Sequence, residues 1–119
     1  MINCPLEKEE AISLIEWARY HPIVRDHLIH HVNEGKRTAW YGKQKQKEGM
    51  RRGISDYFLA YPSNSKYGLW IELKRRNRVI SKLTEEQAIW LARMERTGYA
   101  TGVAYGWEHA VEIIERYLK

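Results

Sequence analysis

The sequence predicts an α/β protein in which a mixed β-sheet is flanked by helices, with the elements in the order helix, strand, strand, strand, helix, strand, helix. Two patterns support this prediction. Apolar residues alternate with polar ones along residues 69–74, as in a strand with one buried face, and they recur every three or four positions along residues 107–118, as in an amphipathic helix. The 119 residues, 44% of them hydrophobic and 29% charged, suit one domain that buries a core without disulfides or a structural metal.

The first half of the chain begins with a helix over residues 7–20, which Pro22 is expected to end. A short strand is expected over residues 26–32. Residues 38–48 are polar and basic and contain good helix formers, but they lack an apolar face. We therefore expect this segment to lie on the surface, packed by its two aromatic residues, Trp40 and Tyr41.

The second half of the chain begins with a predicted hairpin, in which residues 54–61 and 69–74 pair as antiparallel strands around a turn that contains Pro62. Thr84 and Gln87 have the spacing of a capping box, which marks the start of a helix. The remaining expected elements are this helix up to Gly98, a strand over residues 99–105 and a helix over residues 107–118.

Basic residues are concentrated in two segments, residues 36–52 and residues 74–82. Together these segments contain 12 of the 20 Lys and Arg residues and one acidic residue, a net charge of +11, whereas the rest of the chain carries −6. Such asymmetry is typical of a protein that binds a polyanion, and nucleic acid is the first candidate. The alternative is that these residues form ordinary solvated faces. The candidate phosphate contacts are Lys36, Arg37, Lys43, Lys45, Arg51, Arg52, Arg75, Arg76 and Arg78.

The cysteine content is typical of a reducing compartment, and the hydropathy pattern shows no membrane span or signal peptide. Cys4 is the one cysteine, so an internal disulfide and a zinc site built on paired thiolates are both excluded. No apolar run approaches the roughly 20 residues that span a bilayer, and the first residues lack the charge and the apolar stretch of a signal peptide. We therefore expect a cytoplasmic protein that does not associate with membranes.

Three polar residues are expected to meet on the predicted hairpin. Glu72 and Lys74 are two positions apart and project from the same face of their strand. The pairing places Asp56 opposite residues near 73, although a register change of one residue would move it to the other face. Two carboxylates beside a lysine suit a divalent cation such as Mg²⁺, and with it the hydrolysis of a phosphodiester. The alternative is a structural ion pair between Glu72 and Lys74.

Several ordered motifs resemble the VRR-NUC nucleases, a branch of the PD-(D/E)XK superfamily. The sequence departs from the family at Ser55, where a proline is usual, but it keeps the aspartate that follows. The resemblance implies a restriction-endonuclease-like fold. The motifs are GISDYF at residues 53–58, GLWIELK at residues 68–74, LTEEQ at residues 83–87, Gly98-Tyr99, VAYGW at residues 103–107, and NEGKR at residues 33–37, which is similar to a stretch in stand-alone phage members.

The resemblance also implies a set of active-site residues for an endonuclease that depends on Mg²⁺ or Mn²⁺. The metal ligands would be Asp56, Glu72 and the backbone carbonyl of Leu73, and Lys74 would be the catalytic lysine. A glutamate from the first helix usually joins them. Glu10 is the choice here, with Glu9 as a close rival, because Glu10 shares a helical face with Leu14 and Trp17. Gln87 would lie near the active site, although it can equally complete the capping box.

Stand-alone members of the family are associated with homodimers that cut four-way (Holliday) junctions, so the resemblance implies a branched DNA substrate and a role in viral replication and repair in the cytoplasm of a bacterial host. One domain holds one active site, and two coordinated cuts therefore require two chains. Candidate interface elements are Trp40, Tyr41 and the last helix. Trp40 and Tyr41 could instead stack on exposed bases.

Two other functions stay open. A non-catalytic module could bind nucleic acid through the same basic face, but it would not need Asp56, Glu72 and Lys74 together. A sequence-specific restriction-type enzyme would need an element that reads a groove, and none is evident. The histidines at positions 27, 30 and 31 are expected to pack or to contact phosphate rather than to bind a metal, since neighbours in a strand point in opposite directions.

Overall fold

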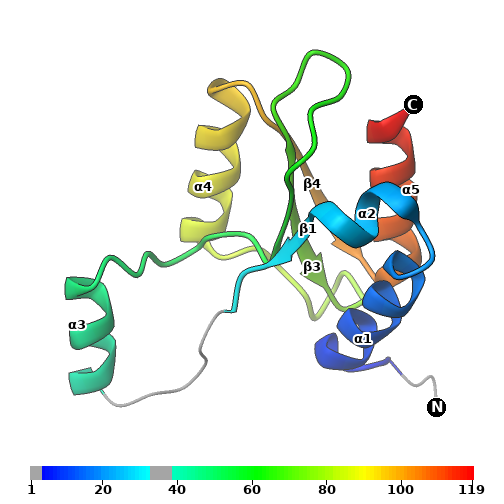
Figure 1. Ribbon diagram of the computed structural model, residues 1–119. Coiled ribbons are helices and arrows are strands. Elements are labelled where there is room, and N and C mark those ends of the chain that lie inside the picture. Colours follow the sequence, from blue (N-terminus) through cyan, green and yellow to red (C-terminus); the bar gives the residue numbers. More distant parts are fainter. Residues whose placement is uncertain (1–3, 33–38) are drawn as a thin grey trace.

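A computed structural model describes residues 4–32 and 39–119 and confirms a mixed α/β fold (Figure 1). Lys36 and Arg37, two of the predicted phosphate contacts, lie outside the described residues. No helix in the described part of the chain is both long and apolar enough to cross a membrane. The elements are α1 (Glu7–Ala18), α2 (Pro22–His27), β1 (Leu28–His30), α3 (Ala39–Lys47), β2 (Tyr57–Leu59), β3 (Leu69–Lys74), α4 (Glu85–Arg96), β4 (Ala100–Tyr105) and α5 (Trp107–Leu118).

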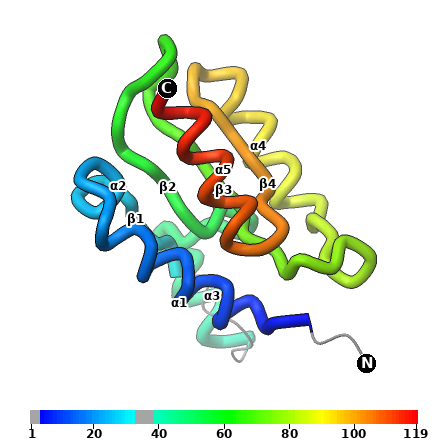
Figure 2. The backbone as a smooth tube through the Cα atoms, turned by 90° about the vertical axis from the view of Figure 1, so that its right-hand side faces the viewer, coloured from blue at the N-terminus to red at the C-terminus, as the bar shows by residue number. Residues whose placement is uncertain are grey.

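The four strands form one sheet in the order β1-β2-β3-β4. The first two pairings are antiparallel, and β4 joins β3 in parallel after the crossover through α4. Tyr57 pairs with Ile71, so Asp56 comes level with Glu72, within one residue of the predicted register. Helices α1, α2 and α5 lie on one face of the sheet and α4 lies on the other, as Figures 1 and 2 show together.

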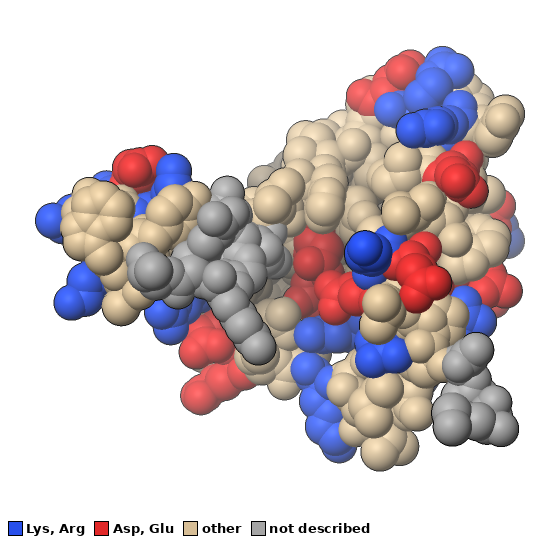
Figure 3. Space-filling model, turned by 90° about the horizontal axis from the view of Figure 1, so that it is seen from below, with Lys and Arg blue, Asp and Glu red and all other residues tan. Residues whose placement is uncertain are grey.

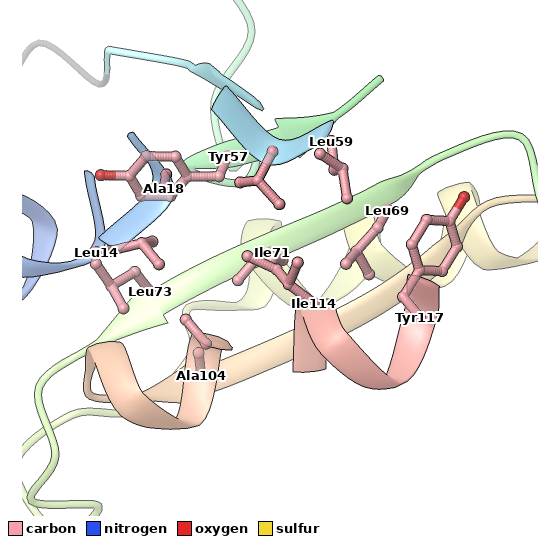
Figure 4. Close-up of a cluster of buried hydrophobic side chains, with 12 residues drawn as sticks. Leu14, Ala18, Tyr57, Leu59, Leu69, Ile71, Leu73, Ala104, Ile114 and Tyr117 are labelled. Atoms are coloured by element: carbon pink, nitrogen blue, oxygen red, sulfur yellow. The ribbon is translucent and has the colours of Figure 1, made fainter. Parts of the chain in front are cut away.

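The hydrophobic core lies between the sheet and helices α1 and α5 (Figure 4). Alternate residues of β2 and β3 point into it, which is the consequence of the two-residue period of a strand. Each buried Leu or Ile contributes about 1.5–3 kcal/mol. The fully buried core side chains include Leu14, Tyr57, Leu59, Leu69, Ile71, Leu73 and Ile114.

The opposite face of the sheet packs against α4 through aromatic rings. Trp70 of β3 stacks on Phe58 of β2, with ring centroids 4.4 Å apart, and it meets Trp90 of α4 edge to face at 5.2 Å. Aromatic pairs in these geometries add about 0.5–1.5 kcal/mol beyond their buried area. The two faces together fix β3, which carries the candidate site, at the centre of the molecule.

The helix and the strand predicted on either side of Pro22 differ in the structure. Pro22 does not simply end a helix: it opens the separate helix α2, where the His21 Nδ1 atom accepts hydrogen bonds from the amides of Ile23 and Val24. Proline suits this position because the first helical amides lack intrahelical partners. The strand expected over 26–32 therefore shortens to Leu28–His30, because Asp26 and His27 belong to α2.

The first strand of the hairpin and the segment before it also differ from the prediction. The strand expected over 54–61 is confined to Tyr57–Leu59, because the Asp56 amide donates to the Glu72 carboxylate. Residues 39–47 form the helix α3, which stands apart from the body of the molecule in Figure 1. None of its described side chains is buried, and Trp40 is 70% exposed, so Trp40 does not pack this segment as expected.

Candidate active site

Asp56 and Glu72 are brought together where β2 begins. The Asp56 amide donates to Glu72 Oε2 at 3.2 Å, and the Leu73 amide donates to Asp56 Oδ2 at 2.7 Å. Each carboxylate is thus held by the backbone beside the other. These reciprocal bonds form because β2 starts one residue after Asp56, which leaves the Leu73 amide without a strand partner at this level.

The electrostatics of this pair favour a cation. Glu72 is 1% exposed, and burial raises its pKa because water no longer stabilises its charge. The neighbouring Asp56 carboxylate raises the pKa of Glu72 further, through both a hydrogen bond and like-charge repulsion. A divalent ion between the two carboxylates would remove this repulsion.

Lys74 stands on the same face of β3 as Glu72, as the sequence predicts. Its Nζ atom lies 3.9 Å from Glu72 Oε1 and donates to Gln87 Oε1 at 2.9 Å. The Gln87 side-chain oxygen also accepts from the Thr84 amide at 2.9 Å, and the Gln87 amide donates to Thr84 Oγ1. Gln87 therefore makes both contacts that the sequence left open, because the first turn of α4 lies beside the end of β3.

Glu10 does not lie with Asp56 and Glu72. Its carboxylate is 1% exposed and accepts two hydrogen bonds from Arg76, at 2.9 and 3.0 Å, and one from the Trp107 amide at 3.1 Å. The Arg76 guanidinium lowers the pKa of Glu10. Glu10 thus caps the start of α5 and ties α1 to the segment after β3. Glu9, its rival, accepts from the Leu6 amide at the start of α1.

Glu7 is the α1 glutamate nearest to the pair, and sequence reasoning missed it. It lines a hollow of about 310 Å³ together with Asp56 and Leu73. Burial raises the pKa of Glu7, and the Asp56 carboxylate adds to the rise. The sequence feature that could have identified Glu7 is its position one turn before Glu10, since residues three positions apart lie on the same face of a helix.

The donor set fits a hard cation such as Mg²⁺ or Mn²⁺. The N–H and C=O of a strand residue point to the same side of the strand, so the Leu73 carbonyl is directed toward Asp56 like its amide. Two carboxylates and a carbonyl are oxygen ligands of the kind that Mg²⁺ prefers, with water in the remaining positions. Within residues 4–32 and 39–119, no group of three His, Cys, Asp or Glu side chains forms a cage of its own.

The predicted basic residues differ in whether a protein group already contacts their charge. Arg75 donates to the carbonyls of Cys4 and Pro5, and Arg76 is paired with Glu10 and Glu108, so both face protein acceptors. Arg78 lies over the Tyr105 ring, with Cζ 4.4 Å from its centroid. Figure 3 shows acidic side chains near the middle of one face with Lys and Arg beside them. Arg51 and Arg52, which follow α3, and Lys43 of α3 are exposed, whereas Lys45 of α3 pairs with Glu48 at 3.2 Å.

Two carboxylates and a lysine at one strand end of a mixed β-sheet are groups that suit an enzyme acting on phosphodiesters. The chain belongs to the VRR-NUC family, because residues 6–108 match the VRR-NUC domain. A solved structure described as a VRR_NUC domain protein has the same fold, with a TM-score of 0.84 and 20% identity over 98% of this chain and 90% of that chain.

Family membership implies a nuclease-type function in DNA processing, and with it DNA binding. Both the family and the fold class expected from the sequence are thereby confirmed. No curated protein matches the chain.

Proposed function

We propose that this protein is a metal-dependent endonuclease that hydrolyses phosphodiester bonds in branched DNA. The observation that carries the proposal is the meeting of Asp56, Glu72 and Lys74 at one end of β3. A non-catalytic binding module would have no use for a buried Glu72 carboxyl group set against the half-buried Asp56 carboxylate.

Asp56, Glu72 and the Leu73 carbonyl would hold Mg²⁺ or Mn²⁺, with Glu7 at the rim of the site on the α1 side. The bound cation would polarise the scissile phosphate and lower the pKa of a coordinated water. The Asp56 and Glu72 carboxylates stay in place without side-chain rearrangement, because each already accepts a backbone hydrogen bond. We propose Glu7 rather than Glu10 as the α1 residue of this site, because Arg76 and the Trp107 amide already donate to the Glu10 carboxylate.

Lys74 would act on the negative charge that develops at the phosphate. Its side chain is 12% exposed, so its ammonium group interacts with charge through less water than a surface lysine does. The Gln87 oxygen holds the ammonium group at a fixed place by accepting one of its three hydrogens. The other hydrogens are available to orient a water or to donate to a phosphate oxygen.

A four-way junction is the substrate that we propose, with the protein acting as a homodimer. Each chain has one candidate site, and two symmetric cuts need two chains related by a two-fold axis. The exposed helix α3, with Trp40 on its surface, is the element that supports a partner surface. The similarity of the sequence to stand-alone phage members supports a role in viral replication and repair.

The decisive test is cleavage of end-labelled four-way junction, flap, linear duplex and single-stranded DNA with Mg²⁺, Mn²⁺ or EDTA. Glu72→Ala should abolish cleavage, whereas the matched control Glu95→Ala, an exposed glutamate on α4, should cut like the wild type. Paired symmetric cuts restricted to the junction would support a dimeric resolvase. Binding without cleavage under every metal condition would replace the proposal with a non-catalytic module.

A further inference from the structure

A groove runs along α1 from the candidate active site. It consists of two adjacent hollows, of about 310 and 360 Å³, which share the lining residues Lys8, Ala11, His30 and Tyr57. The first hollow reaches Asp56, and the second extends past Ile15 toward Arg19. A ligand in this groove would lie directly beside the phosphate at the metal pair.

The groove is lined by the exposed His30 ring and by alkyl groups, with the buried Tyr57 ring behind His30. The exposed His30 ring stacks on the Tyr57 ring, with centroids 4.7 Å apart and planes 18° from parallel. Ala11, Ile12 and Ile15 of α1 form the facing wall, and Ile12 is 56% exposed. Flat π faces opposite aliphatic side chains are the surroundings in which nucleobases stack on proteins.

The Tyr57 hydroxyl adds a hydrogen-bonding group to this apolar groove. Tyr57 is 1% exposed, and its hydroxyl has no hydrogen-bond partner among the residues that the structure describes. The side chain extends toward α1 in Figure 4. A tyrosine hydroxyl is protonated at neutral pH and can act as a donor. A buried donor without a partner is costly, and a ligand acceptor would satisfy it.

We infer that the groove between α1 and β1 receives an unpaired nucleobase of the cleaved strand, next to the scissile phosphate. This inference rests on the proposed nuclease function and names the feature of the substrate that is recognised. Phosphates fit the groove less well, because Lys8 and Arg19 are accompanied there by Glu7 and Glu16. A duplex keeps its base faces stacked inside, so a strand that is unpaired at the cut is selected over linear duplex.

Binding measurements test this inference separately from cleavage. The wild-type protein is titrated in EDTA against fluorescent DNA of one length in three forms: single strand, linear duplex, and a single strand whose sugars carry no bases. His30→Ala should weaken binding of the normal single strand about 10-fold, which corresponds to about 1.4 kcal/mol, and that of the duplex less than twofold. The matched control is His31→Ala, the next residue, which does not line either hollow.

The base-free strand distinguishes a stacking contact from a structural effect. Wild-type protein should bind it about 10-fold more weakly than the normal strand, and His30→Ala should cause no further loss, because the contact is already absent. Tyr57→Phe removes an unsatisfied hydroxyl, so it should leave thermal stability unchanged or higher and still weaken single-strand binding several-fold. An RNA strand of the same sequence should show the same dependence on His30, since its base faces are alike.

Three results would overturn the inference: equal effects of His30→Ala and His31→Ala, equal losses on single strand and duplex, or a His30→Ala loss that persists on the base-free strand. If cleavage is confirmed while any of these occurs, the nuclease function stands and the base-binding groove fails. If the base-dependent binding is found but no metal supports cleavage, the groove stands and the nuclease function fails.

Discussion

Replacement of Glu10 by glutamine is the sharpest test of how this fold is held together. The carboxylate is 1% exposed and accepts three hydrogen bonds, two from Arg76 and one from the Trp107 amide. Glutamine has the same shape but carries no charge. Because both Glu10 oxygens accept hydrogen bonds, the NH₂ group of glutamine would have to face an N–H donor in place of one of them. Removal of one partner of a fully buried pair costs about 3–5 kcal/mol. Arg76 is 44% exposed and regains water, so we expect about 2–3 kcal/mol here.

Thermal and urea denaturation of Glu10→Gln measure this loss. For a chain of this length, 2–3 kcal/mol corresponds to a fall in Tm of about 10 °C. The matched control is Glu108→Gln, because Glu108 pairs with the same Arg76 at 3.1 Å but is 64% exposed. We expect the control to lose less than about 1 kcal/mol, as exposed pairs do. Equal losses in the two variants, or loss of cleavage by Glu10→Gln at unchanged stability, would refute the structural role of Glu10 and return it to the metal site.

Three further outcomes follow from the same contacts. Arg76 lowers the pKa of Glu10, so its contribution to stability is complete above the ordinary pKa of 4.5 and is lost as the pH falls through the lower folded-state pKa. In urea denaturation, the free energies of unfolding of wild type and Glu10→Gln should therefore differ by a constant amount between pH 6 and 8 and converge below about pH 4.5. Burial, and after it the Asp56 carboxylate, raise the pKa of Glu72, so the folded protein bears the cost of this carboxyl group at neutral pH. Glu72→Gln removes that cost, so in EDTA at neutral pH its Tm should exceed that of the wild type by a few degrees, and added Mg²⁺ should no longer raise it. A lower Tm would contradict this account. Tyr117→Phe leaves the Tyr61 carbonyl without its 2.7 Å donor and should cost about 1–2 kcal/mol in urea denaturation, whereas Tyr20→Phe on the exposed surface should cost almost nothing.

Elements with a strong local pattern could be predicted from the sequence closely. Residues 69–74 and 107–118 occur as predicted, because alternation and helical periodicity each reflect the side that faces the core. The capping box of Thr84 and Gln87 was also predicted, since its geometry is local. The sequence did not predict that Pro22 begins a second helix, because proline both ends one helix and suits the first position of the next.

The pair on the hairpin could be predicted from strand periodicity, but its helical neighbour could not. The meeting of Asp56 and Glu72 follows from the pairing register of two strands. Because side chains alternate between faces, a register error of one residue would place the apolar residues on the wrong face, and the correct register can be recognised. Whether Glu7 or Glu10 reaches the pair depends on how α1 is rotated against the sheet. That rotation is set in part by Arg76, whose guanidinium holds Glu10 from a segment 66 positions away. Helical spacing contains no information about such a partner.

The tie between Glu10 and the start of α5 also affects the order in which the protein can form during synthesis. Glu10 and Trp107 are separated by 97 positions, so during synthesis the Glu10 carboxylate on α1 meets all of its donors only after these residues have been added. Contacts this distant in sequence slow folding and form late. The strand β4, which borders β3, also comes after residue 99. A growing chain therefore contains both acidic residues of the candidate site well before it contains the scaffold that holds them, and we expect their arrangement to form only once α5 has been made.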